Sequence, residues 1–91
     1  MAIWTDERSL NEADLDADPH QQFRRWLQEA IDAGERMPQA MALATVGSGG
    51  WPSVRMVLCE DVDQHGFAFQ TNMASPKARD LAAVPHAAAT F

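Results

Sequence analysis

The first regular pattern of apolar residues lies between Pro19 and Ala33, where they recur every three or four positions. This spacing places one apolar stripe along a helix. Asp18 suits the N-cap, Pro19 the first helical position and Gly34 the end of the helix. We therefore expect a helix from about Pro19 to Ala33 with one core-facing stripe, which comprises Phe23, Trp26, Leu27, Ala30 and Ile31.

The residues before this helix show no sustained periodicity. Residues 1–17 are polar and acidic, and their large apolar side chains, such as Trp4 and Leu10, stand alone. Such a composition is typical of a flexible terminal segment. We expect residues 1–17 to form a flexible acidic tail and residues 18–91 to form one domain.

Three strands are expected after the helix. Ala40–Val46 is a short apolar run that ends in β-branched residues, which indicates a buried strand. Trp51–Glu60 follows as the second strand, with Pro52 at an entry or edge position. Gly66–Thr71 is the third strand, and Asp61–Gly66 is expected to be the turn that leads into it.

A second helix and the opening of a fourth strand complete the pattern. Ser75 is a good N-cap and Pro76 a good first residue, so we expect a helix from Pro76 to about Ala83 that ends before Pro85. His86–Phe91 then indicates the start of another strand. The fold class is therefore α+β, with an N-terminal helix, antiparallel strands and a short second helix.

Composition narrows the classes of function. Ninety-one residues make one small domain, and a formal net charge of −6 argues against a nucleic-acid surface. The single cysteine, Cys59, permits no internal disulfide and lies in an apolar strand, so we interpret it as a packing residue. Neither a secretory signal nor a stretch long enough to span a bilayer is visible. We expect a cytoplasmic protein that binds neither nucleic acid nor membrane.

One group of residues could bind an anion. Alternation along the second strand puts Arg55 on the face opposite Val54. Its guanidinium could meet Thr71, Ser75 and Lys77 at the start of the second helix. Two cations, two hydroxyls and a helix N-terminus would form a cradle for one phosphate. The alternative for Arg55 is an ordinary surface ion pair.

Other candidate sites are weaker. Gly47–Gly50 is rich in glycine, but no Lys-Ser/Thr pair ends it and no helical pattern follows, so we interpret it as a hairpin turn. His20 and His65 have no companions at metal-ligand spacing. We identify no catalytic side chain and no metal site.

Several of these segments, taken in order, resemble the N-terminal half of the pyridoxamine 5′-phosphate oxidase family. The resemblance rests on Asp18-Pro19, Phe23–Leu27, Ala40–Val46, Arg55–Leu58, Gly66-Phe67, Phe69, Thr71-Asn72, Ser75, Lys77, Leu81 and Pro85. It implies the family's split β-barrel, incomplete here, and a homodimer that binds flavin mononucleotide (FMN).

The resemblance also implies an activity and a set of cofactor contacts. The activity is oxidation of pyridoxamine or pyridoxine 5′-phosphate to pyridoxal 5′-phosphate with O₂, a step of vitamin B6 metabolism. It would need FMN as the hydride acceptor, while the protein supplies position and charge. By position, the contacts with FMN would come from Arg55, Met56, Val57, Leu58, Gln70, Thr71, Ser75 and Lys77.

The sequence departs from the family pattern at the substrate. Glu60 stands where the family has a lysine that meets the substrate phosphate, and Pro76 replaces a family arginine. A carboxylate facing a phosphate is repulsive, so we expect weakened substrate recognition. Members are about twice as long, and we expect a truncated chain. The alternatives are a truncated, non-catalytic FMN-binding or remnant domain, and a small structural module without a ligand.

Overall fold

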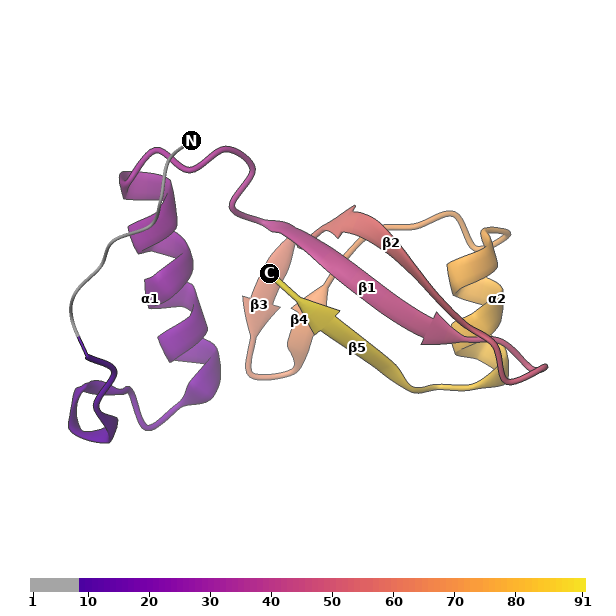
Figure 1. Cartoon of the computed structure of the whole chain (residues 1–91), viewed down its shortest axis with the longest axis horizontal. Coiled ribbons are helices and arrows are strands. Elements are labelled where there is room, and N and C mark those ends of the chain that lie inside the picture. Colours follow the sequence, from indigo (N-terminus) through magenta and orange to yellow (C-terminus); the bar gives the residue numbers. More distant parts are fainter. Residues whose placement is uncertain (1–8) are drawn as a thin grey trace.

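The computed structural model describes residues 9–91, which form two helices and two small antiparallel sheets (Figure 1). The expected tail is therefore described only from Ser9 onward, and Trp4 lies outside the described residues. The elements in chain order are a 3₁₀ turn at Glu12–Asp14, α1 (Pro19–Asp32), β1 (Ala40–Val46), β2 (Pro52–Leu58), β3 (Asp61–Asp63), β4 (Gly66–Ala68), α2 (Pro76–Ala83) and β5 (Ala87–Thr90).

Helix α1 begins and ends almost where the sequence predicts. The Asp18 carboxylate accepts a hydrogen bond from the backbone N–H of His20 at 2.9 Å, and Pro19 is the first helical residue. Ala33 caps the C-terminus, so the helix stops one residue earlier than expected. Its apolar face meets the rest of the chain through Phe23, whose ring lies edge-on to Phe67 at a centroid distance of 5.1 Å.

The segment before α1 is tied to that helix. The backbone N–H of Asp16 donates to the side-chain oxygen of Gln22 at 2.7 Å, and its carboxylate pairs with Arg25 at 3.3 Å. Gln22 is buried. These contacts fix residues just before the helix onto its first turns.

Strand β1 is the centre of a three-stranded sheet of order β2-β1-β5. Its side chains alternate between buried and half-buried, as expected for a strand with one core face. Leu43 pairs with Arg55 on β2 and with Ala89 on β5. The strand predicted within His86–Phe91 therefore forms, and it joins this sheet beside β1.

The region after β2 differs from the expectation. Asp61–Gly66 was expected to be a turn, but Asp61–Asp63 is a strand paired with Gly66–Ala68 across Gln64-His65. The side chain of Val62 is buried, whereas those of the two flanking aspartates are not. This alternation of burial favours a strand. Gly66 closes the turn with a φ of 128°, a conformation that side chains other than glycine rarely adopt. The third strand consequently ends at Ala68, and Thr71 lies in a loop.

The core is small and lies on one face of the sheet. Met41, Cys59 and Val62 form its buried centre, with Phe23, Val57 and Phe69 packed around them. Cys59 is thus a packing residue, as predicted.

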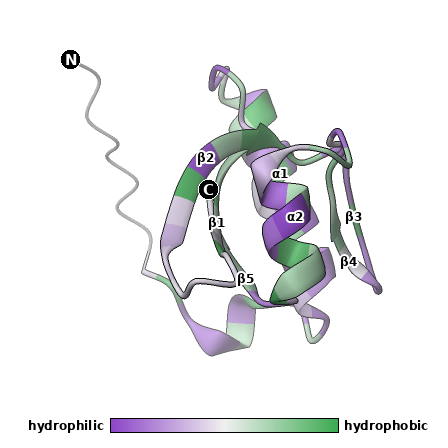
Figure 2. Ribbon diagram, turned by 90° about the vertical axis from the view of Figure 1, so that its right-hand side faces the viewer, coloured by the Kyte–Doolittle hydropathy of each residue, from purple (hydrophilic) through white to green (hydrophobic). Residues whose placement is uncertain are grey.

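The opposite face of β2 is apolar but uncovered in the chain. Val54 and Met56 are each 65% exposed, and Leu58 is 40% exposed. Figure 2 shows α2 against one face of the sheet and apolar segments along β2. Because monomers rarely expose contiguous apolar patches, this outer face, made of Val54, Met56 and Leu58, is a candidate contact surface.

Candidate functional site

The loop before α2 brings two of the predicted site residues together. The hydroxyls of Thr71 and Ser75 lie 3.0 Å apart. Asn72 shapes the loop, because its side chain accepts from the N–H of Ala74 and its carbonyl from the N–H of Ser75. Ser75 also caps α2 by accepting from the N–H of Ala78. Two hydroxyls therefore stand together at the start of a helix.

Lys77 adds a cation at the same helix end. It is the second residue of α2 and is half-buried. Pro76 carries no N–H, and that of Ala78 is taken by Ser75, so the N–H of Lys77 is the one left at the helix start. A free backbone donor, an ammonium group and the positive end of a helix all favour an anion there.

Arg55 forms its hydrogen bonds with residues of β1 and β2 in the described structure. Its guanidinium donates to the hydroxyls of Thr45 and Ser53, both at 2.6 Å, and to the carbonyl of Leu43 at 3.2 Å. It also lies 3.9 Å from the carboxylate of Asp80. Arg55 is thus a member of an ion pair, the alternative that the sequence left open. Its contact with a phosphate stays a prediction.

The structure reveals three polar partners that the sequence analysis did not single out: Thr45, Ser53 and Asp80. Thr45 is fully buried on the core face of β1. A hydroxyl in that position needs hydrogen-bond partners, because burying it without them is costly. The alternation of β1 places Thr45 in line with Met41 and Leu43, and this signal could have identified it.

The other predicted cofactor residues are distributed along β2 and the loop after β4. Val57 lies half-buried on the core face, whereas Met56 and Leu58 lie on the exposed outer face. Gln70 is exposed in the loop. β2 is an edge strand of the described sheet, so one side of its backbone is open to a ligand.

Glu60 lies just after β2, and the cavity that it lines includes no residue of α2. Its side chain is exposed, and it lines a cavity of about 200 Å³ with Arg24, Leu27 and Asp61 among others. Its backbone N–H donates to the carbonyl of Ala68 at 2.7 Å. The position of a substrate relative to Glu60 remains a prediction.

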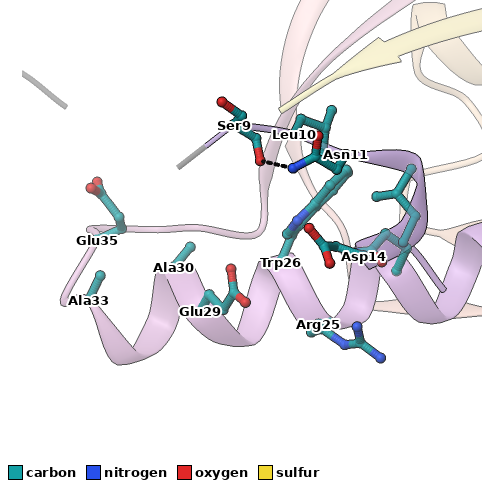
Figure 3. Close-up of a pocket in the computed structure, with 12 residues that line it drawn as sticks. Ser9, Leu10, Asn11, Asp14, Arg25, Trp26, Glu29, Ala30, Ala33 and Glu35 are labelled. Atoms are coloured by element: carbon teal, nitrogen blue, oxygen red, sulfur yellow. Dashed lines mark hydrogen bonds between the residues drawn. The ribbon is translucent and has the colours of Figure 1, made fainter. Parts of the chain in front are cut away.

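A separate groove lies at the N-terminal end of the described residues. It has a volume of about 1100 Å³ and runs between the segment before α1 and α1 itself (Figure 3). Trp26 reaches toward Leu10 and Asn11 across it. All of its lining residues precede Arg36, so it includes neither β2 nor α2.

Two kinds of feature are absent from residues 9–91. Their His, Cys, Asp and Glu side chains include no group of three arranged to hold a metal ion. Neither helix in this part of the chain has the length and apolarity to cross a membrane.

Comparison with known proteins gives a family match over most of the chain. The model of a family described as pyridoxamine 5′-phosphate oxidase matches residues 27–91. Pyridoxine/pyridoxamine 5′-phosphate oxidase of Burkholderia ambifaria is 54% identical over 83 residues, which are 91% of this chain and 39% of that protein. The oxidase of Thermosynechococcus vestitus is 51% identical over 82 residues, 90% of this chain and 39% of that protein.

A solved structure shares the fold. The crystal structure of PhzG from Burkholderia lata 383 in complex with tetrahydrophenazine-1-carboxylic acid superimposes with a TM-score of 0.81 and 34% identity. The match covers 89% of this chain and 41% of that one. The described α+β fold matches the corresponding part of the PhzG split barrel. The chain spans about two fifths of the length of the relatives it matches.

Proposed function

Because the chain belongs to the pyridoxamine 5′-phosphate oxidase family, we propose that it binds FMN through the start of α2 and the edge of β2. In this proposal the activity it serves is oxidation of pyridoxamine or pyridoxine 5′-phosphate to pyridoxal 5′-phosphate with O₂. The names of the relatives support the reaction, and the donors around Thr71 support the cofactor.

The observation that carries the proposal is the chemistry of these donors. Thr71 and Ser75 present two hydroxyls 3.0 Å apart, and Lys77 adds an ammonium group and a free N–H. Charge-assisted hydrogen bonds of this kind are roughly twice as strong as neutral ones. The residues present therefore fit the phosphate end of FMN.

Strand β2 would hold the ring end. In the proposal, the open backbone edge of β2 from Arg55 to Leu58 forms hydrogen bonds with polar atoms of the flavin ring. Gln70 contacts the same ring from the loop after β4. When bound, FMN supplies the hydride acceptor and the reaction with O₂, and the chain fixes its position.

Further parts of the proposal concern assembly and location. We assign the exposed outer face of Val54, Met56 and Leu58 to the contact with a second copy in a homodimer. Burying such a face would stabilise the pair by roughly 25 cal/mol for each Å² of apolar surface removed from water. We also propose a cytoplasmic location, because the reducing cytoplasm would keep the free thiol of Cys59 reduced.

A second candidate is a non-catalytic FMN-binding domain. Two observations favour it. Glu60 places a carboxylate at the position where the family has a lysine, and the chain spans only 39% of the length of its relatives. The two candidates differ in turnover. Pyridoxal 5′-phosphate formation by the FMN-loaded chain, and a gain in the Glu60→Lys variant, would favour the enzyme, whereas FMN binding without turnover in either would favour the binding domain.

The cofactor itself is tested by titration. FMN added to the purified chain should lose fluorescence and co-elute with protein in gel filtration. If FMN separates from the protein completely at concentrations of tens of micromolar, the proposed function is wrong. A dissociation constant in that range corresponds to a binding free energy of about −6 kcal/mol.

A further inference from the structure

Arg55 and Asp80 form an ion pair bridged by two hydroxyls. Thr45 and Ser53 are paired across β1 and β2, so both lie on the face that carries Arg55. Each hydroxyl accepts a hydrogen bond from the guanidinium and donates one to the same carboxylate oxygen of Asp80, at 2.8 Å from Thr45 and 3.4 Å from Ser53. The bridging fixes the direction of both hydroxyl protons, which point to the carboxylate of Asp80.

This arrangement is more constrained than a surface ion pair. The side chains of Arg55 and Asp80 are only 23% and 19% exposed, and Thr45 is fully buried. Gly47 leaves room for the carboxylate, because a Cβ there would lie 3.1 Å from the other oxygen of Asp80. The carboxylate is therefore packed against the turn between β1 and β2 as well as hydrogen-bonded to both strands.

Asp80 also belongs to the helix whose start carries the phosphate donors. It follows Lys77 by three residues on α2, and residues at this spacing are neighbours on a helix surface. Its hydrogen bonds set the rotation and depth of α2 against β1. They thereby set where Ser75 and Lys77 stand relative to Arg55.

We propose that Asp80 is a positioning residue for the flavin phosphate, acting through Thr45 and Arg55 to hold the first turn of α2 in place. This inference rests on the proposed function and adds a residue to its site. Asp80 does not touch the phosphate itself, because its carboxylate would repel it. Removing the carboxylate releases α2 from the sheet and leaves the buried Thr45 hydroxyl without its acceptor.

Comparison of FMN with riboflavin, which lacks the phosphate, isolates this role. Asp80→Ala should weaken FMN binding about tenfold, the equivalent of one charge-assisted hydrogen bond, and change riboflavin binding by less than about twofold. Asp80→Asn should recover most of the FMN affinity, because its amide oxygen still accepts from Thr45. Glu12→Gln, which removes an exposed carboxylate before α1, is the control and should bind FMN like the unaltered chain.

Two results would overturn the inference. One is unchanged FMN affinity in Asp80→Ala. The other is an equal loss of FMN and riboflavin affinity in that variant, because a general loss of structure would affect both ligands.

A flavin-free measurement separates this inference from the proposed function. In NMR spectra of the ligand-free chain, Asp80→Ala should shift the side-chain N–H signals of Arg55 and the amide signals of Ser75 and Lys77, and Asp80→Asn should shift them less. Unmoved Ser75 and Lys77 signals would contradict the positioning role. Failure of the unaltered chain to bind FMN, with these shifts present, would overturn the proposed function and leave Asp80 as the residue that positions α2.

Discussion

The hydroxyl of Thr71 lies 3.0 Å from that of Ser75, which joins the loop after β4 to the N-cap of α2. The contact spans four residues, and the intervening Asn72 turn holds it in place. A pair of hydroxyls at a helix start is a donor set for an anion, and the family relationship makes the anion a flavin phosphate in our proposal.

Replacing Ser75 tests this donor pair. Ser75→Ala removes the side chain that accepts from the N–H of Ala78, so it should destabilise the chain by about 1 kcal/mol. It should also weaken FMN binding, because Thr71 loses its partner. Urea denaturation and FMN titration measure the two effects. Ser48→Ala, an exposed serine in the turn between β1 and β2, is the control, and an equal effect of both variants would contradict the capping role.

The buried hydroxyl of Thr45 should contribute to stability. Thr45→Val keeps the shape of the side chain but removes the buried one of the two hydroxyls that bridge Arg55 and Asp80, at a cost of about 1–3 kcal/mol. Thr45→Ser retains the hydroxyl and should cost less. Denaturant unfolding monitored by tryptophan fluorescence compares the two. A Val variant as stable as the Ser variant would show that the bridge does not matter.

The outer face of β2 should control association. Met56→Lys puts a charge at a position that is 65% exposed in the chain and that we propose to be buried between two copies. Light scattering should give a dimer mass for the unaltered chain and a monomer mass for this variant. Gln64→Lys, in the exposed turn between β3 and β4, adds the same charge and should stay dimeric. Monomeric behaviour of the unaltered chain would refute the dimer.

Cys59 should react slowly with thiol reagents. Burial raises the pKa of the Cys59 thiol above its ordinary value, with smaller opposing effects from hydrogen bonds to the backbone of Asp61 and Ala68. Alkylation at pH 8 should therefore be slower in the folded chain than in urea. A folded-state rate equal to that in urea would contradict a buried thiol.

The same pKa shift has a consequence for stability. The folded chain holds the thiol proton to a higher pH than the unfolded chain does. The protonated thiol therefore stabilises the folded chain fully at pH values below the ordinary thiol pKa. This stabilisation is lost as the pH rises through the raised pKa of the folded chain. Cys59→Ala should flatten this decline in the free energy of unfolding, which begins near the ordinary thiol pKa. A decline that persists unchanged in the variant would assign it to other groups.

Local signals in the sequence predicted both helices because capping residues act over a few positions. Asp18-Pro19 and Ser75-Pro76 each supply an N-cap oxygen and a residue already bent for the first turn. The start of α2 and its end at Ala83 follow the prediction. Half of the candidate site, Thr71 with Ser75, could be predicted for the same reason, since only four residues separate them.

The sequence did not reveal features that depend on distant partners. β3 was missed because two aspartates flank its single buried side chain, Val62, and only pairing with β4 makes the segment a strand. The link between Thr45 and Asp80 spans 35 residues and needs both the β1–β2 register and the packing of α2. No local pattern encodes that combination, so Arg55 was predicted to join Thr71, Ser75 and Lys77 around a phosphate, with a surface ion pair as the alternative.

Binding measurements on variants of Lys77 are the sharpest test of the proposed phosphate site. FMN and riboflavin should be titrated against the unaltered chain, Lys77→Ala and Arg79→Ala, the last of which removes an exposed cation from the same helix. We predict that Lys77→Ala loses about tenfold in FMN affinity, keeps its riboflavin affinity, and differs from Arg79→Ala, which loses less than about twofold. Equal FMN affinities in the two variants would contradict a phosphate site at the start of α2.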